Sequence, residues 1–215
     1  MISGTFGSSP QVLLLAPVRG LTSEVPRVLS ALEQIAPARV GLGLSRDEMA
    51  SLHDYFVVAD AEPIVPLTSN ETSEVRGLVR FGEVRVPNPS FVEVLRWAWS
   101  RNLRIDPLDP DDERTAALFA EHIGYLELVR RTVRERRVAR APPAPSTADE
   151  FALAWDREIA SGRGSRDYAG ARDQYLVDQI PLLSPDRAPV AVVVDRERFD
   201  SIRILLTQGP PTTIA

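Results

Sequence analysis

The sequence predicts an α/β fold, built on a small, mostly parallel β-sheet with helices on both faces. Residues 12–17 (VLLLAP) form a short, continuously apolar run, which is typical of a strand buried on both faces. Residues 25–35 then carry apolar side chains at helical spacing, and residues 38–45 form a second apolar run. This succession of strand, helix and strand indicates a βαβ unit, whose two strands run parallel with a right-handed crossover.

The rest of the chain continues this pattern within a single domain, residues 1–215. Two more strands are predicted, at residues 103–109 and 188–195. Residues 111–183 between these strands form a predicted helical excursion, in which residues 162–170 (GRGSRDYAG) are expected to be flexible. Further helices are predicted over residues 47–58, 71–80, 90–102, 111–140, 148–160, 171–183 and 196–207.

Hydroxyl side chains indicate where several of these helices begin. Thr22 or Ser23 is placed to cap the first helix, and Ser90 to cap the helix that follows two prolines. Ser146 or Thr147 is placed to cap the helix after the stiff APPAP segment. In the longest predicted helix one stripe recurs at helical spacing, formed by Leu118, His122, Leu126, Val129 and Val133.

Composition limits the classes of function. The 215 residues are 44% hydrophobic and 26% charged, which is typical of a globular protein with a sizeable core. A net charge of −5 argues against a dedicated nucleic-acid binder, and the lack of cysteine excludes disulfides, thiolate nucleophiles and cysteine metal sites. The sequence has neither a run of apolar residues that could span a bilayer nor a secretory signal, so we expect a cytoplasmic protein that does not engage membranes.

Ligands of parallel α/β sheets bind beyond the carboxyl ends of the strands. In this chain the first two such ends carry Arg19-Gly20 and Gly43-Leu44-Ser45, without a histidine or a pair of acids. The sequence therefore predicts where a site would lie, and it assigns no catalytic residue there.

Three segments carry a resemblance to a known family. Residues 13–45, 94–112 and 171–206 follow one another as strand, helix and strand; helix and strand; and helix, strand and turn. In this order and spacing the chain resembles the TraB/PrgY–Tiki superfamily, which includes the erythromycin-esterase-like and ChaN-like proteins. Arg172, Asp173 and Tyr175 match the Arg-Asp-x-Tyr-Met motif of that superfamily.

The family's other motif residues are replaced. Arg19 stands near the place of the first histidine, Gly43 at the place of the second strand's glutamate, and Arg198 nearest the final histidine. The resemblance implies metal-dependent or ester hydrolysis in some branches and haem binding in another. A guanidinium can neither bind a metal nor accept a proton, so we expect a catalytically depleted member without metal or cofactor. The two histidines present, His53 and His122, lie in predicted helices away from the strand ends.

Arginines in place of those histidines suggest another use of the same crevice. Arg19, Arg172 and Arg198 are expected to converge beyond the strand ends, where Asp173 and Tyr175 would join them as ligand-binding residues. Because the planar guanidinium suits phosphate and carboxylate, the predicted ligand is an anionic small molecule. In the alternative interpretation, these arginines pair with neighbouring acids and close the site, the acids being Asp173, Asp195 and Glu197.

Carboxylates support a second hypothesis, a metal-dependent hydrolase with a rearranged site. Its acids would come from Asp106, Asp173, Asp195 or Glu197. An acidic turn after the third strand could hold a divalent cation, although aspartates at a helix N-terminus are favourable without a metal. That turn comprises Asp106, Asp109, Asp111 and Asp112.

Two surface features leave interaction partners open. Residues 130–140 (RRTVRERRVAR) place Arg130, Arg134 and Arg137 on one helical face, which could lie along nucleic-acid phosphates or could simply be a solvated helix end. Trp97 and Trp99 are two residues apart, so only one can face the core of a helix. The other could cover a neighbouring helix or a homodimer interface.

Overall fold

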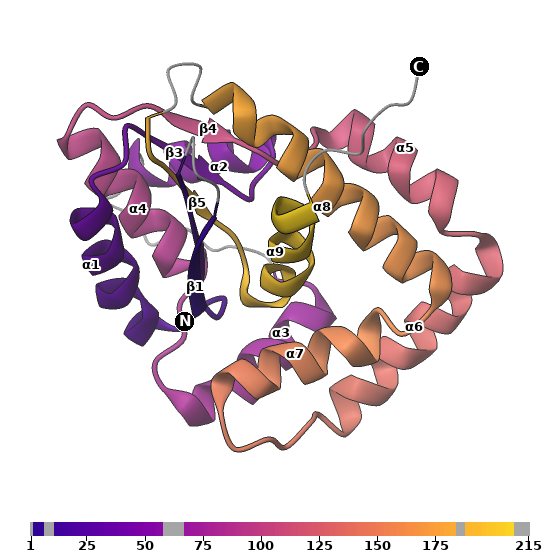
Figure 1. Ribbon diagram of the computed structural model, residues 1–215. Coiled ribbons are helices and arrows are strands. Elements are labelled where there is room, and N and C mark those ends of the chain that lie inside the picture. The colour runs from indigo at the N-terminus through magenta and orange to yellow at the C-terminus, as the bar shows by residue number, and fades with distance from the viewer. Residues whose placement is uncertain (1, 7–10, 58–66, 184–187, 209–215) are drawn as a thin grey trace, which may run out of the picture.

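The computed structural model describes residues 2–6, 11–57, 67–183 and 188–208, and it has the predicted α/β architecture (Figure 1). Within these ranges, five strands form one sheet in the order β1-β2-β5-β3-β4. Neighbouring strands run parallel from β2 to β4, whereas β1 pairs antiparallel with β2 at the edge. The strands are β1 (Ile2–Phe6), β2 (Val12–Ala16), β3 (Arg39–Leu42), β4 (Ile105–Pro107) and β5 (Val190–Val193).

Nine helices accompany this sheet within the described ranges. Their bounds are α1 (Val25–Ile35), α2 (Arg46–Val57), α3 (Ser69–Leu78), α4 (Pro89–Ser100), α5 (Asp112–His122), α6 (Tyr125–Arg140), α7 (Ala148–Ile159), α8 (Arg163–Leu183) and α9 (Phe199–Gln208). The last residue of the helix predicted over 47–58 lies outside the described residues.

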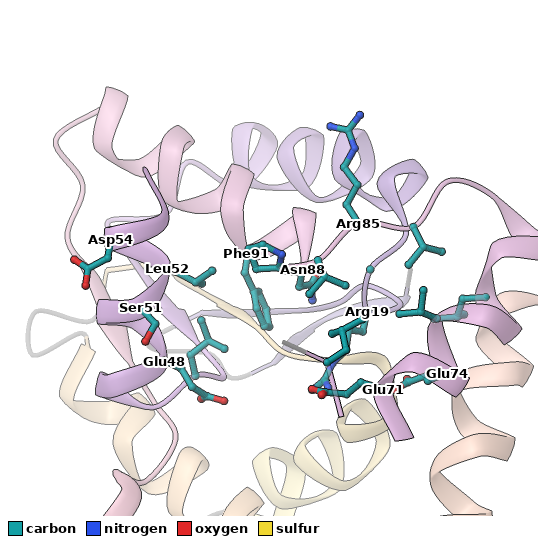
Figure 2. Close-up of a pocket in the computed structure, with 18 residues that line it drawn as sticks. Arg19, Glu48, Ser51, Leu52, Asp54, Glu71, Glu74, Arg85, Asn88 and Phe91 are labelled. Atoms are coloured by element: carbon teal, nitrogen blue, oxygen red, sulfur yellow. The ribbon is translucent and has the colours of Figure 1, made fainter. Parts of the chain in front are cut away.

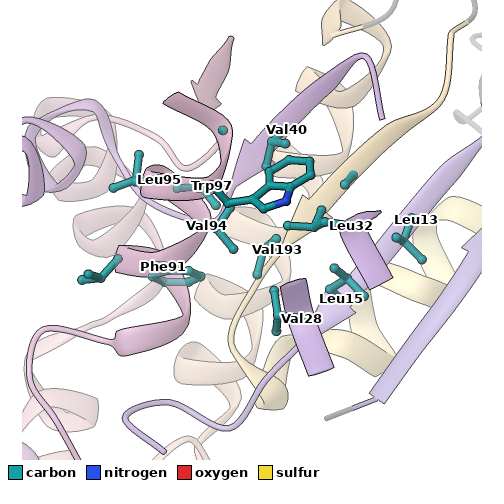
Figure 3. Close-up of a cluster of buried hydrophobic side chains, with 14 of the residues drawn as sticks. Leu13, Leu15, Val28, Leu32, Val40, Phe91, Val94, Leu95, Trp97 and Val193 are labelled. Atoms are coloured by element: carbon teal, nitrogen blue, oxygen red, sulfur yellow. The ribbon is translucent and has the colours of Figure 1, made fainter. Parts of the chain in front are cut away.

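Both faces of the sheet are buried, as the continuous apolar runs predict. Side chains alternate along a strand, so Leu13 and Leu15 of β2 point to one face and Leu14 to the other. The first face packs against α1 and α4 through residues such as Leu32 and Trp97 (Figure 3). The second face packs against α8 and α9 in a separate cluster. The middle strands therefore lie in the interior of a three-layer arrangement.

The helical excursion between β4 and β5 contributes to a third hydrophobic cluster, which it shares with α3 and the loop after β2. Helices α3, α6 and α7 lie side by side below the sheet (Figure 1). Phe151 and Trp155 of α7 are buried there together with Leu78 of α3. Val18 and Leu21, from the loop after β2, complete this cluster. The excursion is thus fixed to the carboxyl edge of the sheet, where the site is expected.

The prediction of one long helix over residues 111–140 is wrong, because this segment forms two helices, α5 and α6. Chain direction changes after α5, and Gly124 in extended conformation precedes α6. The predicted stripe is split by this break: Leu118 is buried, but Leu126 and Val133 are 68% and 61% exposed. Helical spacing alone therefore predicted one continuous stripe, but the second half of this stripe faces away from the core.

Other local predictions differ from the structure at helix ends. Residues 163–170, expected to be flexible, form the first turns of α8. Asn88 caps α4 instead of Ser90, because Pro89 occupies the first helical position and the Asn88 side chain accepts from the Ser90 N–H at 3.1 Å. No side chain caps α1, since a short 3₁₀ turn precedes it. The predicted Thr147 cap of α7 is confirmed.

The edge strand β1 was not predicted. Its sequence ISGTF lacks both a continuous apolar run and a clear alternation. Its hydrogen bonds come from β2, whose outer edge it covers. None of the helices in the described ranges is long and apolar enough to cross a bilayer.

Candidate functional site

The carboxyl ends of the parallel strands meet where the sequence predicts. Gly43, directly after β3, donates its N–H to the carbonyl of Val193 at the end of β5. A Cβ on Gly43 would lie 3.0 Å from Val194 and 3.3 Å from the Arg198 guanidinium. Glycine at this position therefore makes the room that the Arg198 side chain occupies, so Gly43 and Arg198 are neighbours in space.

Arg198 belongs to an ionic cluster that we call the buried tetrad, formed by Asp109, Arg172, Asp173 and Arg198. Asp109 Oδ2 accepts from Arg172 Nη2 at 2.5 Å and from Arg198 Nη1 at 2.8 Å. Arg198 Nε donates to Asp173 Oδ1 at 2.7 Å. Two guanidinium groups and two carboxylates balance one another, and both aspartates are buried.

Pairing with the two aspartates affects the pKa of Arg198. Burial disfavours the charge on Arg198, but Asp109 and Asp173 outweigh that effect and raise the pKa of Arg198 above its ordinary value. Asp109 Oδ1, Arg172 Nε and Arg198 Nη2 are buried and have no hydrogen-bond partner among the described residues. The charges of the tetrad are thus paired within it, although these three atoms make no hydrogen bond with a described residue.

A second arrangement, which we call the cavity pair, consists of Arg19 and Asp195. Arg19 follows β2, and both its Nε and its Nη2 donate to Asp195 Oδ2, at 3.1 and 2.6 Å. Asn88 donates its side-chain N–H to the other carboxylate oxygen, Oδ1, at 3.1 Å. Asp195 is buried, whereas the Arg19 side chain is 48% exposed. Asn88 was not predicted as a site residue. The only signal for Asn88 in the sequence is its place before Pro89 at the start of a helix.

Two more carboxylates lie near the cavity pair. Asp195 raises the pKa of Arg19 well above its ordinary value. Burial, and then the charge of Asp195, raise the pKa of Glu197 to about 8. Burial also raises the pKa of Glu74, against the opposing effect of Arg19. One guanidinium thus faces three acids, and the balance found in the buried tetrad is missing here.

Arg19 also lines a cavity of about 580 Å³ at the carboxyl ends of β2 and β3 (Figure 2). The walls come from α2 on one side and α3 on the other, with the segment before α4 between them. Most of the lining is apolar. The lining residues are Arg19, Gly20, Leu44, Glu48, Ser51, Leu52, Asp54, Leu67, Glu71, Glu74, Val75, Leu78, Val84, Arg85, Val86, Pro87, Asn88 and Phe91.

The structure divides the predicted ligand-binding residues between two places. Arg172, Asp173 and Arg198 come together in the buried tetrad, and Tyr175 is half-buried on the same helix, α8. None of these four lines the cavity, whereas Arg19 does. The alternative interpretation describes the ion pairs correctly for Arg19 with Asp195 and for Arg198 with Asp173. Whether any of the five binds a ligand stays a prediction.

Most of the acids considered for a metal or for hydrolysis have other partners. Asp106 pairs with Arg104 at 2.8 Å, and Asp111 caps α5 by accepting from the Arg114 N–H. Within the described ranges, no group of three histidine, cysteine or acidic side chains could hold a metal ion. His53 is exposed, with its ring 5.5 Å from that of Trp99.

The candidate nucleic-acid face on α6 is partly neutralised. Arg134 pairs with Glu127 at 2.7 Å, and Arg137 pairs with Glu158 at 2.6 Å. Arg130 is exposed and makes no ion pair with a described residue. On α4, Trp97 is buried and Trp99 is 41% exposed, as their spacing predicts. A homodimer interface at Trp99 stays a prediction.

No protein-family model matches this chain, and no curated protein is significantly similar to it. The resemblance to the TraB/PrgY–Tiki superfamily therefore stays a prediction, which rests on the order of the segments and on the Arg-Asp-x-Tyr match.

Proposed function

We propose that this chain is a binding protein, a catalytically depleted relative of the TraB/PrgY–Tiki superfamily that holds a small molecule in the cavity between α2 and α3. The observation that carries this proposal is the cavity itself. Its volume of about 580 Å³ and its apolar lining with few polar groups are typical of small-molecule sites. It also lies at the carboxyl edge of a parallel sheet, where α/β folds bind their ligands.

The residues at this edge favour binding over hydrolysis. Arg19, Gly43 and Arg198 stand where the resembled family has its histidines and glutamate, and a guanidinium cannot act as general base or metal ligand. The arginines do not form one anion site, because Arg172 and Arg198 are engaged by Asp109. The proposed ligand site is therefore limited to the cavity and to the cavity pair at its edge.

A bulky side chain at the mouth of the cavity tests this proposal. Ser51 of α2 is exposed and lines the cavity, so Ser51→Trp should fill it, whereas Ala50→Trp adds the same ring on the same helix outside the lining. We expect phenylbutanol, a neutral probe, to bind the wild type and the A50W variant, and to bind the S51W variant at least about tenfold more weakly. The measurement is ligand-observed NMR titration, with circular dichroism to confirm folding. Equal binding to all three proteins, or binding to none of them, would overturn the proposal.

A further inference from the structure

We propose that the ligand of this cavity carries a protonated amine, held by Glu74 beside the cavity pair, and an apolar body that contacts Phe91 and the α2 wall. This inference rests on the proposed function and names the ligand's chemical class. The proposed ligand is a cation, whereas the arginines alone predict an anion.

The charges of the lining are strongly unequal. Both guanidinium groups in the wall already have carboxylate partners outside it: Arg19 pairs with Asp195, and Arg85 pairs with Glu83 at 2.8 Å. Their positive charge is therefore matched before the acids of the wall are considered. Those acids are Glu48, Asp54, Glu71 and Glu74.

The four acids of the wall have no guanidinium partner among the described residues. Glu48 accepts from the Ser45 N–H at 2.7 Å, at the start of α2. Glu71 accepts from the N–H and the hydroxyl of Thr68 at the start of α3. Neither contact brings a positive charge to the carboxylate, so the acids of the wall outnumber its guanidinium groups without being paired by them, which favours a cation in the cavity.

Among these acids, Glu74 combines partial burial with the lack of a hydrogen-bond partner. It is half-buried on α3 next to Arg19, and it makes neither a hydrogen bond nor an ion pair with any described residue (Figure 2). A partly buried carboxylate without a donor is unfavourable, and this is reflected in its raised pKa. An ammonium group brings three donors and a positive charge to this position. Binding would thus give this carboxylate the charged partner that it lacks among the described residues.

The opposite part of the cavity suits an apolar body. Phe91 and Leu52 are buried core residues whose surfaces reach the cavity, and Val75 and Leu78 extend the apolar wall on α3. The ring of Phe91 lies between the two helical walls (Figure 2). A ligand with a compact apolar part can therefore bury it here while its amine reaches Glu74.

Three probes with one apolar body and different head groups test this inference: phenylbutylamine, phenylbutanol and phenylbutyrate. Their affinities are measured by NMR titration for the wild type, for Glu74→Gln and for Glu121→Gln, an exposed acid outside the cavity. We expect the amine to bind the wild type about tenfold more tightly than the alcohol, and the butyrate to bind most weakly. Glu74→Gln should remove the preference for the amine and leave the alcohol unchanged, and Glu121→Gln should change neither. Lowering the pH should weaken the amine and leave the alcohol unchanged, because the pKa of Glu74 is raised and its protonation removes the charge that holds the ammonium.

The other outcomes separate the two proposals. If the alcohol binds the wild type but not S51W and the amine binds no better, the binding function stands and the amine inference is wrong. The inference is also overturned if Glu74→Gln keeps the amine preference, or if the butyrate binds most tightly, which would restore the anionic ligand. If none of the probes binds, the proposed function fails and the inference fails with it.

Discussion

The buried tetrad and the cavity pair lie at the same edge of one sheet and use the same two residue types, yet they differ in burial and charge balance. In the tetrad, Arg198 is 14% exposed and two arginines meet two aspartates. In the cavity pair, Arg19 is 48% exposed, and two further acids with raised pKa values, Glu74 and Glu197, lie near it. Arginine at a strand end therefore does not define an anion site, because its neighbours decide whether any charge is left for a ligand.

The largest expected difference between the two regions is in stability. Asp109→Asn removes the carboxylate that two arginines share, so Arg172 loses its carboxylate partner and Arg198 keeps only Asp173. We expect the free energy of unfolding to fall by about 3 kcal/mol, measured by denaturant titration. Asp112→Asn changes an exposed acid in the same segment and should cost less than about 1 kcal/mol. A similar decrease in the free energy of unfolding in both variants would show that the tetrad does not stabilise the fold.

The matched substitution in the cavity pair should cost much less. In Asp195→Asn the half-exposed Arg19 can be solvated, and the repulsion that Asp195 exerts on Glu74 and Glu197 is removed. We expect the free energy of unfolding to change by about 1 kcal/mol or less in the same titration. If this variant is destabilised as strongly as Asp109→Asn, the distinction between a structural tetrad and an open cavity pair is wrong.

The smallest expected effect is a pH dependence of stability that comes from Glu197, near the cavity pair. Glu197 has its pKa raised to about 8 from an ordinary 4.5, so between these values the folded protein holds a proton that the unfolded chain releases. The free energy of unfolding therefore falls as the pH rises through this window. Glu197→Gln should remove most of that fall, raising the melting temperature by about 3 °C at pH 8.5 and leaving it unchanged at pH 4.

The control for this pH effect is Glu121→Gln, which should leave the melting temperature unchanged at both pH values. Some of the fall with pH should remain in Glu197→Gln, because the pKa of Glu74 is raised as well. A Glu197→Gln difference that is equal at pH 4 and pH 8.5 would contradict the raised pKa of the half-buried Glu197.

Local patterns predicted much of the fold. The apolar run at residues 12–17 predicted a strand buried on both faces, and the observed strand β2 is fully buried. Weak local signals were missed or misread. The edge strand β1 has no clear pattern of its own, since its pairing with β2 defines it. The exposed second half of the α5–α6 stripe, with Leu126 and Val133, shows that helical spacing indicates a face without saying what covers it.

The sequence by itself predicted the α/β class, the parallel strands and the edge of the sheet at which the cavity lies, because the periodicity of apolar residues and the order of strand, helix and strand can be read along the chain. Only the tertiary structure decided which charges meet. Arg19 and Asp195 are 176 positions apart, and Asp109 joins Arg198 across 89 positions. The cavity acid Glu74 had no sequence signal, because its importance comes from a wall that α2 and α3 build only after folding. Charge balance depends on distance in space, and spacing along the chain does not encode it.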